Sequence, residues 1–199
     1  MYRQFFLILR CHSISTGSFQ TRSKRQHIAT LQFIPASQWN TEARYGFYAL
    51  GPESRSAVPA LMDIANQNIS HESQYSAIAA LSYIGPSARE VVPSLIRWVT
   101  NADNTVRFYA IQALGAIHDE PDRLVPVLTN ALHDQDIDVQ RSAVMALRNL
   151  GPNAKAAVPA LLRSLNGPVV VTDMRASITN ALRQIDPETA ARAGITNAP

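Results

Sequence analysis

The apolar residues of this chain gather in short phrases that recur every 33 to 35 residues. One phrase consists of two apolar residues, a proline, one further residue and a leucine, and its prolines are Pro59, Pro93, Pro126 and Pro159. A second phrase follows about twenty residues later and ends on a leucine, at Leu81, Leu114, Leu147 and Leu182. A fixed period of this length predicts an array of helical repeats.

The second phrase has the spacing of one face of an α-helix. In one copy the apolar residues are Ala110, Ile111, Leu114 and Ile117, and positions 1, 2, 5 and 8 lie on the same side of a helix. Each repeat is therefore predicted to hold two short amphipathic helices. Because a single pair cannot bury its apolar faces alone, stacked pairs are expected to share one continuous core.

Turn residues separate the predicted helices. Glycine ends a helix and a following proline prevents its continuation, and this pair occurs at Gly51-Pro52, Gly85-Pro86 and Gly151-Pro152. Aspartates stand where the second helices should begin and serve as caps, at Asp103 and Asp136. The caps predicted for the first helices are Ser87, Asp119 and Asn153. The phrase prolines fall in the first one or two turns of the first helix, which they kink where the preceding turn is already helical.

Together these residues resemble the HEAT repeat, and more closely the HEAT-like repeat named after the phycobilisome-linker lyase family. The resemblance rests on Gly-Pro, Ala-Val-Pro-x-Leu, an aspartate, Val-Arg and Ala-x-x-Ala-Leu, and it covers roughly residues 43–186. It implies an all-α fold, a right-handed α-α superhelix (a HEAT-like solenoid) of about four helix pairs. Ankyrin and tetratricopeptide arrays have similar periods, but their signature phrases do not occur in the sequence.

The resemblance also implies a ladder of aspartate and arginine side chains between successive repeats. Asp103 and Arg107 occupy the ladder positions in one repeat. Gln74 and Gln140 replace the arginine in the neighbouring repeats. We therefore expect an incomplete ladder.

Charge divides the chain into a basic start and a slightly acidic body. Residues 1–41 carry five basic and no acidic side chains, whereas residues 42–199 carry 13 basic and 15 acidic side chains. We predict a basic, disordered segment over 1–35, a HEAT-like array over 36–193 and a tail over 194–199. The first segment can be a disordered tail, a miscalled start or, in a eukaryote, a mitochondrial transit peptide.

The same charge pattern bears on partners and location. A solenoid that grips nucleic acid should present a basic groove, so the acidic body disfavours nucleic acid. No stretch approaches the roughly twenty apolar residues of a membrane span. The single cysteine, Cys11, allows no internal disulfide, and we take a cytoplasmic location as the default.

Residues suited to catalysis or metal binding are sparse. The dipeptide His71-Glu72 is similar to the metal-binding dipeptide of a family of HEAT-repeat iron hydroxylases, but here it occurs once. Acidic groups around Asp119 and Asp136 fall at predicted turns, where capping and solvation explain them. We predict no catalytic residue, no metal and no cofactor.

The second helix of each pair carries the residues predicted to bind a partner. Concave solenoid surfaces are the usual binding sites, and the resemblance implies that second helices line that surface. Aromatic and arginine side chains often dominate interface energies, and such residues occupy non-core positions of these helices. The candidate partner-binding residues are Tyr75, Arg107, Phe108, Tyr109, Gln112, Arg141 and Met145.

We therefore expect a non-catalytic scaffold that binds another protein. Two alternatives stay open: a chromophore-lyase-like subunit, which the resemblance permits, and a regulatory fragment of a larger enzyme or array. Phe108 and Tyr109 can also serve only to pack against a neighbouring helix. Trp98, on a predicted first helix, is expected to pack between helices.

Overall fold

The structure is a computed structural model that describes residues 46–67, 70–167 and 172–195. It divides into two compact units, residues 1–84 and 85–199. The segment predicted over 1–35, the start of the helix expected over 36–50 and the end of the tail lie outside the described residues. The described residues contain helices and no strand, as an all-α fold requires.

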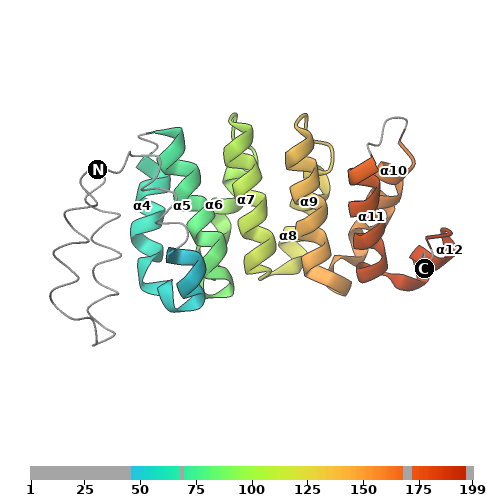
Figure 1. The fold of residues 1–199 in the computed structure, drawn as a ribbon, viewed down its shortest axis with the longest axis horizontal. Helices are drawn as coiled ribbons and strands as arrows, with labels where there is room; N and C mark the ends of the chain where they lie inside the picture. Colours follow the sequence, from blue (N-terminus) through green and yellow to red (C-terminus); the bar gives the residue numbers. More distant parts are fainter. Residues whose placement is uncertain (1–45, 68–69, 168–171, 196–199) are drawn as a thin grey trace. The chain divides into compact units, whose positions relative to one another are not determined.

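The described part of the first unit, residues 46–67 and 70–84, contains one complete helix pair. Residues 46–50 are helical, and a 3-10 helix, two α-helices and the short connection between them follow: η1 (Gly51–Ala57), α4 (Val58–Gln67) and α5 (His71–Ile84). α4 packs against α5 (Figure 1). Phe47, Leu61 and Leu81 are among its fully buried side chains.

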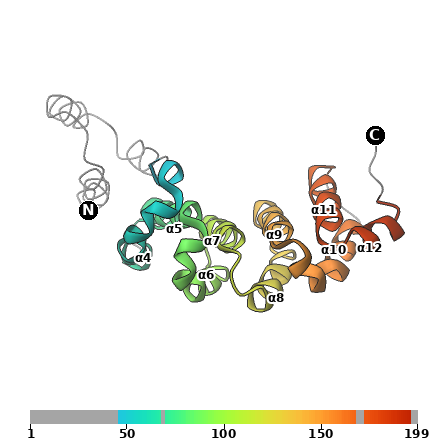
Figure 2. The same ribbon diagram turned by 90° about the horizontal axis from the view of Figure 1, so that it is seen from below.

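The second unit contains three further pairs and a short final helix. Its elements are η2 (Gly85–Val91), α6 (Val92–Trp98), α7 (Asn104–Ile117), α8 (Pro121–Ala131), α9 (Ile137–Leu150), η3 (Gly151–Ala157), α10 (Val158–Leu165), α11 (Thr172–Ile185) and α12 (Pro187–Arg192). In this unit α7, α9 and α11 form one layer and α6, α8 and α10 the other (Figures 1 and 2). The predicted alternation of first and second helices is therefore present.

The core lies where the phrases placed it. Every leucine that ends a phrase has no exposed surface: Leu61, Leu81, Leu95, Leu114, Leu128, Leu147, Leu161 and Leu182. Trp98 is buried as well, which agrees with packing between helices. Full burial of a leucine stabilises a fold by about 1.5–3 kcal/mol, so the repeated leucines supply a core along the array.

The caps of the second helices follow the prediction, and those of the first helices do not. Asp103 and Asp136 accept hydrogen bonds from the backbone N–H groups of the first turns of α7 and α9. Ser87 and Asn153 are not caps, because the 3-10 helices begin earlier, at Gly85 and Gly151. Asp119 is not a cap either. The residue at the N-cap of α8 is Glu120, and the Glu120 side chain makes no capping hydrogen bond.

The phrase prolines begin α-helices more often than they kink them. In α4, α6 and α10 the proline is the second residue, after a 3-10 turn. Proline suits this position because the first helical N–H groups have no partner inside the helix. Only in α8, among the described helices, does the proline (Pro126) lie inside, after a start at Pro121. In η2 and η3 the backbone bends ahead of the proline, where Ala88 and Ala154 leave helical geometry.

A residue with a positive φ follows α5, α7 and α9. Gly85 and Gly151 have φ values of 64° and 56° after α5 and α9, a conformation that glycine adopts without steric cost. After α7, which has no Gly-Pro pair, His118 adopts φ 40° instead. His118 is left-handed in both φ and ψ, whereas Gly151 has a ψ of −138°, so the two turns differ although both begin with a positive φ.

Candidate functional site

A groove of about 680 Å³ runs between α7 and α9 in the second unit. Both helices are second helices of their pairs, the elements predicted to bind a partner. The lining residues of α7 and its neighbour are Asn104, Thr105, Phe108, Tyr109, Gln112, Gly115, Ala116, Asp136, Asp138, Arg141, Ser142, Met145, Ala146 and Asn149. Five of the seven predicted partner-binding residues lie among them.

The two helices run parallel in a fixed register. The Ser142 hydroxyl donates to the backbone oxygen of Phe108 at 3.4 Å, and the Asn149 amide donates to that of Gly115 at 3.5 Å. Both hydrogen bonds join residues 34 positions apart in the sequence. The second bond lies two helical turns after the first, so α7 and α9 keep the same alignment over that length. Each lining residue of α7 therefore faces a defined residue of α9.

The floor of the groove consists of small residues. A Cβ atom at Gly115 would lie 2.7 Å from the Cα and Cβ atoms of Ala146, which is too close for any larger side chain to fit without movement. Ala116 completes the small surface on α7. Small residues here let the helices approach and leave open space above them.

The walls of the groove are aromatic and apolar. The rings of Phe108 and Tyr109 meet edge to face with their centroids 5.0 Å apart and an angle of 86°. Met145, on the opposite helix, is 44% exposed. In the described part of the chain, few large apolar side chains are as exposed as Met145.

Tyr109 occupies a position that is small in the other repeats. The equivalent residues are Ser76, Ser142 and Ser177. Ser76 and Ser142 are buried, whereas Tyr109 is only half-buried. The aromatic wall is therefore particular to this groove and does not follow from the repeat pattern.

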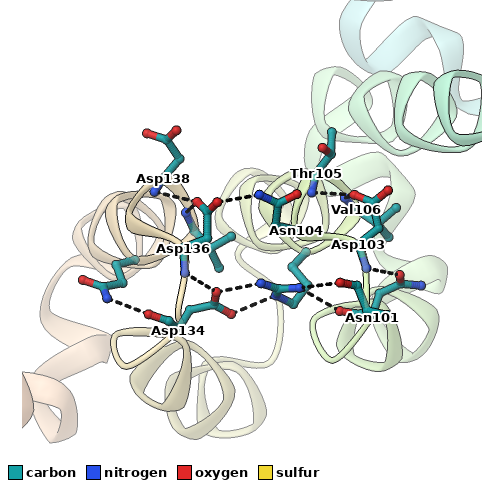
Figure 3. A network of polar contacts seen from close by, with 12 residues as sticks. Asn101, Asp103, Asn104, Thr105, Val106, Asp134, Asp136 and Asp138 are labelled. Carbon is teal, nitrogen blue, oxygen red and sulfur yellow. Dashed lines mark hydrogen bonds and ion pairs between the residues drawn. The ribbon is translucent and has the colours of Figure 1, made fainter.

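A polar network borders the groove at the N-terminal ends of α7 and α9 (Figure 3). The Asn104 amide donates to the Asp136 carboxylate, which also accepts the backbone N–H groups of Asp138 and Val139. These bonds tie the start of α7 to the cap of α9. The hydrogen bond from Asn104, followed by those from the backbone, lowers the pKa of Asp136 below its ordinary value.

Arg107 joins the two repeats on the loop side of the same network. Its Nε and Nη2 atoms donate to the two Asp134 oxygens at 2.8 Å each, and Nη1 donates to the backbone oxygens of Asn101 and Ala102. Both side chains are about 15% exposed. The paired hydrogen bonds raise the pKa of Arg107 and lower that of Asp134.

This ion pair corrects the form of the predicted ladder. Arg107 binds Asp134 and not Asp136, the cap that corresponds to Asp103. Gln140, at the arginine position of the next repeat, donates to the backbone oxygen of Asp134 at 2.6 Å. Gln140 thus donates to the loop that precedes its own helix, as Arg107 donates to the backbone oxygen of Asn101. Because glutamine carries no charge, it cannot form the ion pair that Arg107 forms.

The predicted site residues separate into three places. Phe108, Tyr109, Gln112, Arg141 and Met145 line the groove. Arg107 belongs to the network and borders a second hollow of about 610 Å³ on the loop side, so its side chain is engaged in structure. Tyr75 lies on α5 in the first unit and is half-buried.

The candidates selected from the sequence do not include Gly115, Ser142, Ala146 or Asn149, which also line the groove. Gly115, Ser142 and Ala146 lie outside the apolar pattern at positions 1, 2, 5 and 8, and no aromatic or charged group marks them in the sequence. Within residues 46–67, 70–167 and 172–195, no group of three or more His, Cys, Asp or Glu side chains is arranged to hold a metal ion. His71 and Glu72 begin α5. None of the described helices combines the length and apolar character that a bilayer span requires.

Comparisons with known proteins identify the repeat class. The model of the PBS lyase HEAT-like repeat matches residues 106–134, and that of the HEAT repeat matches residues 124–154. The chain thus carries HEAT repeats, as the sequence pattern predicted. No curated protein matches the sequence.

Solved structures support the same class of fold. The complex of CpcE and CpcF of phycocyanin lyase from Nostoc sp. PCC7120 is 19% identical, with a TM-score of 0.60 over 81% of this chain and 99% of that one. A designed armadillo repeat protein in complex with the peptide (KR)4 is 16% identical, with a TM-score of 0.59 over 93% and 98%. At such identities the similarity establishes the fold alone, a helical repeat of the HEAT and armadillo type.

Proposed function

We propose that this chain is a non-catalytic scaffold that binds a peptide segment of another protein in the groove between α7 and α9. The observation that carries the proposal is the groove itself. Its volume of about 680 Å³ is within the range of about 300–1,000 Å³ typical of ligand sites. It lies on the second helices, and solenoids commonly bind partners along such a repeated surface.

The composition of the groove favours a protein partner. Tyrosine and arginine are the side chains that most often dominate interface energies, and they do so when surrounded by groups that exclude water. Phe108 and Tyr109 provide aromatic side chains of this kind, and Met145 adds exposed apolar surface. Gln112 and Asn149 add amide groups that can both donate to and accept from a peptide backbone.

A fixed groove also reduces the cost of binding. Hydrogen bonds from Asn104 and Ser142 hold α7 and α9 in register, and the contact of Gly115 with Ala146 sets their approach. A surface that is ordered before binding loses less conformational entropy when the partner arrives. The designed armadillo protein with its bound peptide is a structural precedent for a repeat array in this role.

A selection from a displayed random-peptide library tests the proposal. The matched control is a variant in which groove residues are exchanged for those of other repeats: Phe108→Ala as at Ala176, Tyr109→Ser as at Ser76, and Met145→Gln as at Gln112. We expect peptides selected on the unaltered chain to bind the variant at least about tenfold more weakly. Equal binding to both proteins, with both folded by circular dichroism, would place the binding surface elsewhere.

A chromophore-lyase-like role is the second candidate, favoured by the match to the PBS lyase HEAT-like repeat and the fold shared with phycocyanin lyase subunits. Its test is a titration with bilin followed by visible absorbance. A spectral change that saturates at one bilin per chain would support this role over the first. An unchanged spectrum would count against it.

A further inference from the structure

We propose that the groove between α7 and α9 selects partner segments that present a basic side chain to its Asp138 end, beside an apolar or aromatic side chain that contacts Phe108 and Met145. This inference rests on the proposed function, because it specifies the chemistry of the peptide bound in the same groove. Three features carry it: the charge at one end of the groove, the accessibility of one carboxylate there, and the aromatic wall next to it.

The end of the groove at the helix N-termini is negatively charged. The segments that form it, residues 101–107 and 134–141, contain four carboxylates and two guanidinium groups, a net charge of −2. The carboxylates are Asp103, Asp134, Asp136 and Asp138. Complementary charge at such a rim steers a partner's approach and selects against partners of the wrong sign.

The four carboxylates are not equally free to bind. Asp103 and Asp136 cap helices, and Asp134 is held by Arg107. Asp138 lines the groove with 63% of its side chain exposed. Its partner is Arg141, at 3.1 Å and 39% exposed. An exposed pair of this kind contributes only about 0–1 kcal/mol, so a partner's ammonium or guanidinium group can replace Arg141 at small cost.

The neighbouring rings favour a cation as well. A guanidinium or ammonium group over the face of a tyrosine or phenylalanine gains about 0.5–1 kcal/mol at an exposed site. The rings of Phe108 and Tyr109 line the groove and meet edge to face. The aliphatic stem of a long basic side chain can also cover apolar surface such as Met145.

An acidic segment would meet the opposite conditions. The cation available to it in the groove is Arg141, which already has a carboxylate partner. Bringing a further carboxylate to this end would place it against a net negative charge. Like charges brought together at an interface cost free energy, which is how binding surfaces reject a wrong partner.

The test compares two synthetic peptides of equal length that each contain one phenylalanine and differ only in carrying lysines or glutamates. Fluorescence anisotropy at low salt measures their affinities for the full chain. We expect the lysine peptide to bind at least about tenfold more tightly, with the difference shrinking at high salt because screening weakens exposed charges. Equal affinities, tighter binding of the glutamate peptide or no binding of the lysine peptide would overturn the inference.

Two variants built from residues of other repeats give opposite expected changes. Asp138→Thr, the residue at Thr105, should weaken the lysine peptide by about threefold, and Arg141→Ala, the residue at Ala176, should strengthen it by a similar factor. Changes of the same sign in both variants would indicate a merely structural effect and contradict the inference.

The library selection separates this inference from the proposed function. If selected peptides depend on the groove residues but are enriched in acidic or neutral residues, the scaffold proposal stands and the preference for basic segments is wrong. If selected peptides bind the exchanged variant equally well, the groove is not the binding surface and both proposals fail.

Discussion

Arg107 and Phe108 are adjacent in the sequence of α7, yet they belong to two regions with opposite properties. Arg107 is part of the inter-repeat network, where it donates to both oxygens of Asp134 and to two backbone oxygens. Phe108 lines the groove, where side chains stay partly exposed and Met145 is 44% exposed. The network is satisfied internally, whereas the groove leaves surface for a partner.

The contrast shows that one residue type can serve either purpose. Arg107 and Arg141 both have an aspartate partner, but the first pair is about 15% exposed and bidentate, while the second is 39% and 63% exposed with a single bond at 3.1 Å. Burial and bidentate geometry strengthen an ion pair, and solvent weakens it. Exposure and geometry, more than residue type, therefore decide whether an arginine holds the fold or remains available for binding.

The largest expected effect comes from the core beneath both regions. Leu114→Ala removes a fully buried side chain of α7, and leucine truncations of this kind cost about 2–5 kcal/mol. Urea unfolding measures the loss. Because the core supports both regions, hydrogen exchange of backbone amides should quicken in the network and along the groove together. Faster exchange in one region alone would show that the two are not built on a common core.

The next effect separates the two arginines directly. Arg107→Gln introduces the residue found at Gln74 and Gln140 and removes two charge-assisted hydrogen bonds to Asp134. We expect it to lower the free energy of unfolding by about 1–3 kcal/mol. The control, Arg141→Ala, should change it by about 0.5 kcal/mol or less. Equal losses in the two variants would remove the distinction between network and groove.

Acidic pH should erase part of that distinction. The pKa of Asp134 is lowered by its hydrogen bond from Arg107, so its stabilising contribution is present above the ordinary carboxyl value of about 4 and is lost as the pH falls through the lowered value. The stability gap between the unaltered chain and Arg107→Gln should therefore narrow below about pH 4. Leu114→Ala is the control, because it changes no titratable group. If the stability difference between the unaltered chain and Arg107→Gln does not change with pH, the ion pair of Arg107 with Asp134 is not its cause.

Much of the fold is predictable because the repeat makes each signal appear several times. The leucines that end the phrases are buried, and Asp103 and Asp136 cap α7 and α9, as their positions indicated. The first helices were less predictable. Gly-Pro leads into a 3-10 turn before the α-helix, and the sequence pattern does not distinguish that turn from the start of the α-helix.

The candidate site was predictable in its wall and not in its floor. Phe108 and Met145 could be selected because they occupy non-core positions of the second helices. Gly115 and Ala146 are small residues outside the apolar pattern, and their close contact appears only when α7 and α9 lie side by side. Arg107 shows the converse case. Its repeat position suggested both a ladder role and a binding role; the structure places it in an ion pair with Asp134, and the binding role stays a prediction.

A small change in stability is expected at the groove wall. Tyr109→Ser introduces the residue found at Ser76, Ser142 and Ser177, so the repeat can accommodate it. The lost ring contact with Phe108 is worth about 0.5–1.5 kcal/mol, and we expect the free energy of unfolding to fall by about 1 kcal/mol or less. Binding of a library-selected peptide should weaken by about 1 kcal/mol or more, roughly fivefold.

A matched control for Tyr109→Ser is Tyr48→Ser, which also breaks an edge-to-face ring pair, that of Tyr48 with Tyr83 at 5.4 Å. Tyr48 is 71% exposed and does not line the groove. Thermal melts and peptide titrations of both variants should therefore show similar stabilities but a binding loss in Tyr109→Ser alone. If Tyr109→Ser instead loses about 3 kcal/mol or more, as truncated core aromatics do, Tyr109 packs the repeat together. The groove would then lose the aromatic wall that distinguishes it from the network.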